Sequence, residues 1–388
     1  MKTRILLSLI CVGLLAYCAK VGVTTPPLIH VQAELFDQEN TETLGLVQAQ
    51  NTETFTIFEP KETDYRYNNG VVLLPFKGKL YAQWQSSSKD EDGPETEVKF
   101  SVSDEGKNWS LPEILAPARE NAIVTSGGWW TDGETLIAYI NVWPSFTYED
   151  RSGYTEYISS KDGVVWSAPQ RVLDIDGVPV NGVIEQDAHT TRTGRIVTAF
   201  HTSPGLHVKP FYTDDPLGIT GWTQGEFENL PTTKAVSREI EPSWFSRPNG
   251  DLVMVFRDQD SSYQTIVSVS ENDGVSWTDP ELAAFPDSRS KQSAGNLPNG
   301  DVFRVNNPRN TKIRSPLVVS LSKDGVVFDK AWLLRGGGDD LQALRYEGKY
   351  KSIGYSYPKS VIWGDYLYVG YATNKEDVQI SRVPWKNL

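Results

Sequence analysis

The chain has 388 residues, of which 39% are hydrophobic and 11% aromatic, enough for one large domain or two ordinary ones. Its formal net charge of −13 argues against nucleic acid and against a polybasic membrane patch. The only cysteines are Cys11 and Cys18, so the sequence predicts a folded part without disulfide, cysteine nucleophile or thiolate metal site.

The N-terminus, MKTRILLSLICVGLLAYCAK, has the features of an export signal. Basic residues precede an apolar run over residues 5–15 that is too short to span a bilayer. The segment LAYC (15–18) is similar to a bacterial lipobox, in which Cys18 is the lipidated residue. We therefore expect residues 1–19 to direct export to the periplasm or cell surface. Any membrane attachment is expected only through an N-terminal lipid.

One turn signature recurs along the chain. It is found in SDEGKNW (103–109), SKDGVVW (160–166), SENDGVSW (270–277) and SKDGVVF (322–328), with DDPLGITGW (214–222) as a looser copy. Each segment follows a β-like run. Asp or Asn side chains bond the backbone of such a turn, Gly supplies positive φ, and the aromatic residue anchors the turn. We expect these segments to be hairpin clips with a structural role.

A second repeat, Gly-x followed by an apolar run, sets the architecture. It begins at Gly78, Gly133, Gly194, Gly250, Gly300 and Gly364. The spacing of 50 to 64 residues leaves room for about four short strands per repeat, which is typical of a β-propeller. The sequence therefore predicts an all-β, six-bladed propeller as one domain over residues 28–388, with residues 28–60 adding a closing strand to the last blade. Seven blades are the alternative.

The repeated S-x-D-x-G-x-x-W boxes resemble the Asp-box, or BNR repeat, of the sialidase superfamily over most of the chain after the export segment. Sialidases hold the substrate carboxylate with three arginines from different blades, and the resemblance assigns these roles to Arg66, Arg257 and Arg314. It also implies that Glu241, sixteen residues before Arg257, works with a catalytic tyrosine, and that Tyr355 in GYSYP is this tyrosine.

Two features depart from the sialidase pattern. The first-blade loop, YAQWQSSSKDEDGPETE (81–97), does not place Asp90 or Asp92 in the usual setting of the acid/base Asp. Blocks such as DSRSKQSAGNLPNG (287–300) and RYEGKYKSIGYSYPK (345–359) are more similar to the sialidase-like propellers with which marine and gut bacteria degrade uronic-acid polysaccharides. That group includes lyases and related eliminating enzymes acting on ulvan-type glycans.

Further side chains are candidates for the site. His189 and His201 flank the third blade's inner strand, where they are candidates for a general acid or base near neutral pH. Polar residues at the fifth blade's inner-strand position need partners, and a pocket for sugar hydroxyls, carboxylate or sulfate would provide them. These residues are Arg289, Lys291 and Gln292. Tyr357 and Lys359 follow Tyr355 closely and are more typical of a sheet aromatic and a rim charge.

Three functions compete at this point. The first is β-elimination on a uronic-acid glycan, by a lyase or dehydratase in bacterial polysaccharide degradation; arginines neutralise the carboxylate while a Tyr or His removes the C5 proton. The second is retaining exo-hydrolysis of a sialoside, with Tyr355 as nucleophile and Glu241 as its base. The third is a non-catalytic glycan-binding propeller. The sequence predicts a monomer without cofactor or metal whose partner is an acidic oligo- or polysaccharide.

Overall fold

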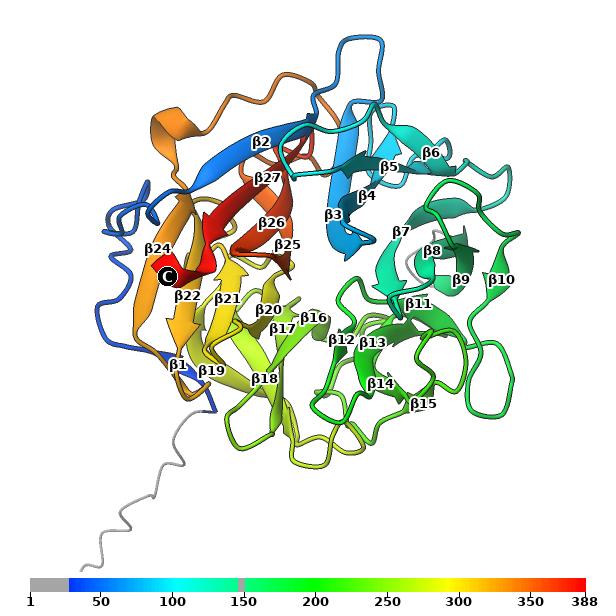
Figure 1. Ribbon diagram of the computed structural model, residues 1–388. Helices are drawn as coiled ribbons and strands as arrows, with labels where there is room; N and C mark the ends of the chain where they lie inside the picture. Colours follow the sequence, from blue (N-terminus) through cyan, green and yellow to red (C-terminus); the bar gives the residue numbers. More distant parts are fainter. Residues whose placement is uncertain (1–27, 146–150) are drawn as a thin grey trace, which may run out of the picture.

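The computed structural model describes residues 28–145 and 151–388, and nearly all regular structure in them is β-strand. The strands pair into six sheets arranged around one axis (Figure 1). The predicted all-β propeller is thus confirmed. The expected export segment, with Cys11 and Cys18, lies outside the described residues. No helix in the described part is long and apolar enough to cross a membrane.

Each sheet runs outward from an inner strand. The first contains β3 (Tyr67–Phe76), β4 (Lys79–Ser87), β5 (Glu97–Ser103) and β6 (Glu113–Ala116). The second contains β7 (Ile123–Thr131), β8 (Leu136–Ser145), β9 (Ser152–Ser160) and β10 (Gln170–Arg171). The third contains β11 (Gly182–Ile184), β13 (Ile196–Thr202), β14 (His207–Thr213) and β15 (Thr223–Gln224), with β12 (His189–Thr190) also paired to β13.

The other three sheets complete the ring. The fourth contains β16 (Glu239–Ser246), β17 (Leu252–Asp258), β18 (Gln264–Ser270) and β19 (Glu281–Pro286). The fifth contains β20 (Ser293–Asn296), β21 (Val302–Asn306), β22 (Leu317–Ser322) and β24 (Lys330–Arg335). The sixth contains β25 (Tyr355–Trp363), β26 (Tyr366–Thr373), β27 (Asp377–Pro384) and β2 (Glu53–Phe58). The short 3-10 helices are η1 (Gly338–Asp340) and η2 (Trp385–Asn387).

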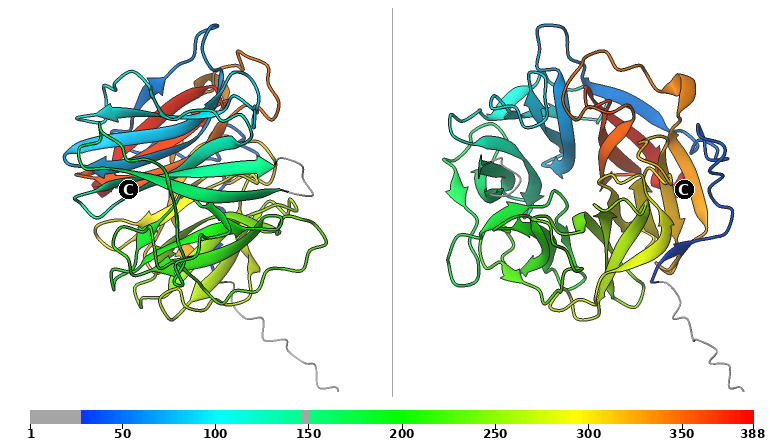
Figure 2. Two further views of the ribbon diagram at one scale, coloured as in Figure 1. Left: turned by 90° about the vertical axis from the view of Figure 1, so that its right-hand side faces the viewer. Right: turned by 180° about the vertical axis from the view of Figure 1, so that it is seen from behind.

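The N-terminal segment ties the ring together. β2 pairs antiparallel with β27, so residues 28–60 supply the closing strand that the repeat pattern predicts. β1 (His30–Val31) pairs parallel with β19 and with β23 (Val327–Phe328), so it extends the fourth sheet to the recurring turn that follows β22. The rear view in Figure 2 shows the first and last parts of the described chain side by side in the sixth sheet.

The recurring turns form the predicted clips. In one of them, the Gly163 N–H donates to the Ser160 hydroxyl at 2.8 Å, and the N–H groups of Val164 and Val165 donate to Asp162. Burial anchors the aromatic residues, and Phe328 is 0% exposed. Apolar side chains from neighbouring sheets pack between the blades as the core.

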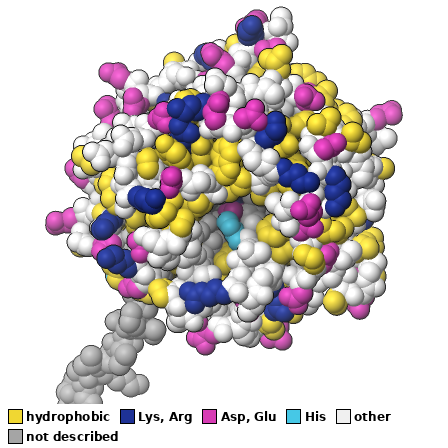
Figure 3. Space-filling view, viewed as in Figure 1, with side chains coloured by type: hydrophobic (Ala, Val, Ile, Leu, Met, Phe, Trp, Pro, Cys, Tyr) yellow, Lys and Arg dark blue, Asp and Glu magenta, His cyan; other side chains and the backbone are white. Residues whose placement is uncertain are grey.

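The inner strands are interrupted where they face the axis. Four of them break register with the next strand, at Asn69–Val72 in β3, Ser126–Gly128 in β7, Ile240–Ser243 in β16 and Ser356–Lys359 in β25. In the third sheet, residues 185–188 separate β11 from β12. A β-bulge bends a strand and re-aims its side chains. Figure 3 shows one face of the molecule hollowed at its centre, with a histidine side chain visible there.

Candidate active site

Two of the bulges present the central side chains of the site. Glu241 and Tyr357 have left-handed φ values of 51° and 56°, and each is followed by a proline, Pro242 or Pro358. Proline has no N–H to donate to the ladder, so the pairing breaks at these positions. At each bulge the strand no longer alternates its side chains between its two faces, and this changes the direction of the Glu241 or Tyr357 side chain.

Arg257, near the end of β17, joins the two bulges. Its Nη1 donates to Glu241 Oε2 at 2.7 Å and to the Tyr357 hydroxyl at 3.2 Å, while Nη2 donates to Gln259 Oε1 at 2.9 Å. The side chains of Arg257 and Glu241 are only 12% and 13% exposed. Glu241, Arg257 and Tyr357 therefore form one partly buried cluster from the fourth and sixth sheets, which we call the central triad.

Further cations surround the Tyr357 ring. The guanidinium of Arg314 and the ammonium of Lys291 each lie 5.2 Å from the ring centroid, and the ammonium of Lys375 lies 5.7 Å away. Arg314 Nη1 also donates to the Ser356 hydroxyl at 3.0 Å. The structure thus brings Arg257 and Arg314 together at one tyrosine, and no carboxylate is paired with Arg314 among the described residues.

The electrostatics fix the protonation of the central triad. Burial opposes ionisation of Glu241, but the charges of Arg257 and Lys291 outweigh it and hold the pKa of this carboxyl well below its usual range. Burial and the Glu241 charge raise the pKa of Tyr357, and Arg257 offsets only part of that rise. A protonated phenol therefore faces an ionised carboxylate.

A buried ion pair lies beneath the triad. Lys291 donates to Glu185 Oε1 at 2.6 Å and to Gln186 Oε1 at 2.9 Å. His201 Nε2 accepts the backbone N–H of Glu241 at 3.4 Å and lies 3.6 Å from Glu185 Oε2. Burial lowers the pKa of His201, which favours the neutral imidazole that this acceptor role requires. His201 therefore supports the Glu241 bulge.

A second ion-pair network adjoins the first. Asp187 accepts from Lys359 Nζ at 2.8 Å and contacts His189 Nε2 at 2.7 Å, and the His189 ring meets the Trp244 ring edge-on at 5.4 Å. Burial opposes ionisation of Asp187, but Lys359 and His189 hold its pKa below the usual range. His189 and Lys359 thus join the third sheet to the sixth and do not contact the central triad.

The first-sheet loop brings acids towards the triad. Glu91 pairs with Lys375 at 2.9 Å, and Asp92 lies 3.9 Å from Arg151. Burial, followed by the charge of Glu91, raises the pKa of Asp92, so this carboxyl is biased towards its protonated form. Asp92 therefore keeps its proton to a higher pH than an ordinary aspartate.

Two sequence-predicted residues lie outside this cluster. Tyr355 is 0% exposed, and its hydroxyl donates to the backbone oxygen of Gly336 at 2.8 Å. Because of the bulge at Ser356–Lys359, the side chains of Tyr355 and Tyr357 point in different directions, and that of Tyr355 lies in the core. Arg66 pairs with Glu62 at 3.1 Å and lies over the Tyr346 ring at 5.4 Å, which places it at the rim.

The predicted polar segment of the fifth sheet has a mainly internal role. The Gln292 side-chain oxygen accepts from Arg304, and its backbone oxygen accepts from Lys359 Nζ at 3.2 Å. The charge of Lys291 is already paired with Glu185. Arg289 is partly buried in a left-handed conformation with φ 59° just before β20. These contacts pair Lys291 and both oxygens of Gln292 within the protein.

Sequence reasoning missed Glu185, Asp187 and Lys375, and it ranked Tyr357 behind Tyr355. A signal for Tyr357 was present, because a proline inside a predicted strand marks a break in the ladder, as Pro242 also does after Glu241. The acids carried no comparable signal. No group of three or more His, Cys, Asp or Glu suited to a metal ion occurs in residues 28–145 and 151–388.

Comparison with solved structures gives the same fold at low sequence identity. A protein of unknown function from Dyadobacter fermentans is 15% identical, with a TM-score of 0.66 and coverage of 86% of this chain and 99% of that one. The intramolecular trans-sialidase from Ruminococcus gnavus is 13% identical, with a TM-score of 0.65 and coverage of 86% and 98%. The Hadza microbial sialidase Hz136 is 14% identical, with a TM-score of 0.68 and coverage of 86% and 69%.

No curated protein sequence matches the chain. The family model described as BNR repeat-like domain matches residues 78–369, which is well over half of the chain. The match contains all of the recurring turns and the fourth and fifth sheets. The sialidase-like BNR-repeat propeller that the sequence predicts is therefore confirmed, and the chain belongs to the BNR repeat-like domain family.

Proposed function

We propose that the chain is a glycoside hydrolase of the sialidase type, which removes a terminal acidic sugar. The observation that carries this proposal is the central triad, in which a protonated phenol lies beside an ionised carboxylate and both contact Arg257. Such a pair supplies a nucleophile with its own base. The sialidases and trans-sialidase among the structural neighbours agree with this choice.

In the proposed reaction Arg314 binds the substrate carboxylate, because its guanidinium has no acidic partner among the described residues. The Tyr357 oxygen forms a bond to the anomeric carbon while its proton passes to Glu241. The bond to the leaving oxygen breaks, and that oxygen takes the proton of Asp92. Water then attacks the anomeric carbon, gives its proton to Asp92 and releases the sugar, and Tyr357 recovers its proton from Glu241.

Elimination on a uronic acid is the second candidate. It is favoured by the position of Asp92, whose ion-pair partner is Arg151 and not a member of the central triad. Elimination requires a base and a neutralised carboxylate: Tyr357 with Glu241 would take the C5 proton, and Arg314 would hold the carboxylate. Glu241 takes the phenol proton so that the Tyr357 oxygen can accept the C5 proton. The C4–O bond then breaks, the leaving oxygen takes the proton held by Glu241, and an unsaturated uronate remains.

The two reactions differ in their products. The purified protein is incubated with a fluorogenic sialoside and, separately, with glucuronate-ended oligosaccharides whose conjugated double bond is followed by absorbance. Release of the fluorophore supports hydrolysis. Rising absorbance with no fluorophore release contradicts it and favours elimination, and mass spectrometry then separates chain cleavage from loss of water. Binding of either acidic sugar without turnover would leave a glycan-binding propeller.

A further inference from the structure

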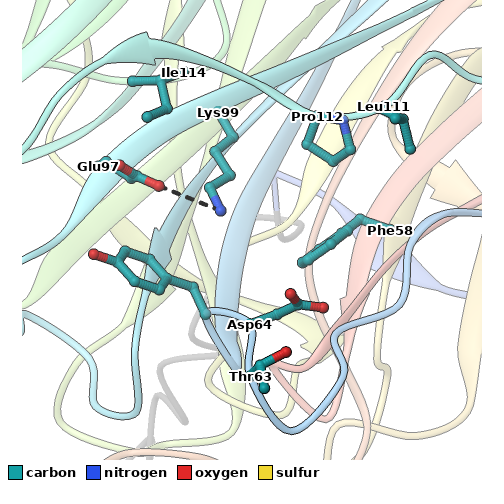
Figure 4. Close-up of a pocket in the computed structure, with 9 residues that line it drawn as sticks. Phe58, Thr63, Asp64, Glu97, Lys99, Leu111, Pro112 and Ile114 are labelled. Carbon is teal, nitrogen blue, oxygen red and sulfur yellow. Dashed lines mark ion pairs between the residues drawn. The ribbon is translucent and has the colours of Figure 1, made fainter.

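A pocket of about 570 Å³ lies away from the central triad, between the sixth and first sheets (Figure 4). Phe58 at the end of β2 forms one side, β5 and the start of β6 form the other, and residues 63–65 contribute the segment before β3. A volume of this size matches the range of small-molecule sites in proteins, roughly 300–1,000 Å³. Neither Glu241, Arg257 nor Tyr357 lines it.

The walls of this pocket are aromatic and apolar. Phe58 is held by stacking on Trp84, with ring centroids 6.2 Å apart and an angle of 23° between the planes. Two large apolar side chains at the edge of the pocket, Leu111 and Ile114, are 86% and 57% exposed to solvent. Adjacent exposed apolar side chains are typical of binding surfaces. The pocket therefore offers preformed apolar surface, and its aromatic side is rigid.

The polar groups of the pocket are acceptor-rich. Lys99 Nζ is paired with Glu97 at 3.3 Å and lies 4.8 Å from the Tyr65 ring centroid and 5.6 Å from that of Phe58. Figure 4 shows this ion pair facing Phe58 and Asp64 across the cavity. Because Glu97 already neutralises Lys99, Asp64 leaves the pocket with one excess negative charge.

We propose that this pocket is a second glycan subsite, which binds a neutral pyranose. The apolar face of the sugar packs on Phe58, Tyr65 and Leu111, and its hydroxyls donate to the carboxylates. The negative excess excludes an acidic sugar by like-charge repulsion. The pocket is thus complementary to the inner, uncharged part of a glycan, whereas the cation-rich triad suits its acidic end.

The two sites share one segment of chain. Tyr65 lines the pocket, and the ring of Tyr67, two residues later, lies 5.6 Å from Lys375 Nζ, which also lies 5.7 Å from the Tyr357 ring. Two extended residues span at most about 7 Å, so this short segment runs from the pocket towards the central triad, and we propose that one glycan follows it. This link to one substrate rests on the proposed function, whereas binding of a neutral sugar in the pocket does not.

The test uses the full chain carrying Tyr357→Phe, with lactose as the neutral probe and glucuronate as the acidic probe, followed by saturation-transfer NMR. Lactose is expected to bind with a dissociation constant in the millimolar range. Leu111→Ser and Phe58→Ala are each expected to weaken it at least fivefold. Ile175→Ser, which changes an equally apolar side chain that is 67% exposed elsewhere, should leave it unchanged.

Three results would overturn the subsite: no lactose binding, lactose binding that Leu111→Ser and Phe58→Ala leave intact, or glucuronate competing for the same pocket. The Leu111→Ser variant is expected to stay folded, because the Leu111 side chain is exposed and adds little to the core. Absence of sialoside turnover by the unsubstituted chain, together with lactose binding in the pocket, would contradict the proposed function and leave the subsite standing.

Discussion

The hydroxyls of Tyr355 and Tyr357 meet different surroundings, although the two residues lie close together in one strand. Tyr357 lies against Arg257 with its ring among cations, whereas Tyr355 donates to a backbone oxygen in the core. We expect Tyr357→Phe to lower kcat by about 10³-fold or more, because the nucleophile is lost while the fold is kept. Tyr355→Phe is expected to cost about 1–2 kcal/mol of stability and little activity.

Steady-state kinetics and urea unfolding of both variants check this contrast. Each change removes one oxygen from a tyrosine of β25, so the pair is matched in chemistry and differs in position. A Tyr355→Phe protein that is stable and inactive would reverse the assignment of the nucleophile.

His201 makes stability depend on pH. Its folded pKa is lowered by burial, with Lys291 and Arg151 adding to that effect and Glu185 and Glu241 opposing it. The pKa of histidine in the unfolded chain is about 6.5. When the pH falls below this value, His201 takes up a proton in the unfolded chain but not in the folded one, so the free energy of unfolding decreases. His201→Gln should reduce the difference in unfolding free energy between pH 7.5 and 5.5 by about 1 kcal/mol.

Chemical denaturation at the two pH values measures this effect. His207→Gln, at the first residue of β14 and outside the central triad, is the matched control. An unchanged pH dependence in His201→Gln would show that other groups carry the acid sensitivity.

At the scale of the elements, the bulges depend on residues that tolerate left-handed backbone. Gly70 in β3 has φ +66°, and an added Cβ would lie 2.9 Å from Gln186 Nε2, the residue that helps to hold Lys291. Gly78 has a similar φ of +79° with open space around it. Gly78→Ala therefore reports backbone strain alone, and Gly70→Ala reports strain plus displacement of Gln186.

We expect Gly78→Ala to cost about 1 kcal/mol and Gly70→Ala about 2–3 kcal/mol. Urea midpoints of the two variants give the comparison. Gly70→Ala should also lower activity, since Gln186 links the first inner strand to the floor of the site. Equal costs in the two variants would mean that Gln186 moves aside freely.

Local sequence patterns predicted the repeated strands and turns, but not the contacts between distant segments of the chain. Turn chemistry and the repeat of about 50–64 residues are local signals, so the clips and the propeller could be read from the sequence. Arg257 and Glu241 kept their expected spacing because one hairpin joins them. Tyr357 was ranked below Tyr355 because a bulge shifts the direction of a strand. Glu185 and Lys291 lie 106 residues apart, and no local pattern encodes their pairing.

For the whole molecule, the decisive contact is the one that closes the ring. Arg382 in β27 donates to Glu53 in β2 from Nε at 2.9 Å and Nη2 at 2.6 Å, and its Nη1 donates to the Tyr368 hydroxyl at 2.9 Å. Its side chain is 7% exposed. We expect Arg382→Met to cost about 2–3 kcal/mol, because hydrogen bonds to a buried charged group are lost.

Lys386→Met provides the control for this closing contact. Lys386 pairs with Asp365 at the same end of the chain, but the two side chains are 63% and 73% exposed. An exposed pair contributes little, so the change is expected to stay within about 0.5 kcal/mol. Thermal unfolding of both variants distinguishes ring closure from a general loss of positive charge, and similar shifts in Tm would argue against a special role for Arg382.

The pairing of β2 with β27 also imposes an order of events on biosynthesis. Thr54 meets Ser381 across this pair, 327 residues later in the chain. A ribosome must deliver the chain as far as β27 before the sixth sheet has its final edge, while earlier hairpins form as they emerge. Until β27 emerges, β2 of a nascent chain has no partner strand. Newly made copies are therefore vulnerable to proteases and to swapping strands with one another until β27 has been made.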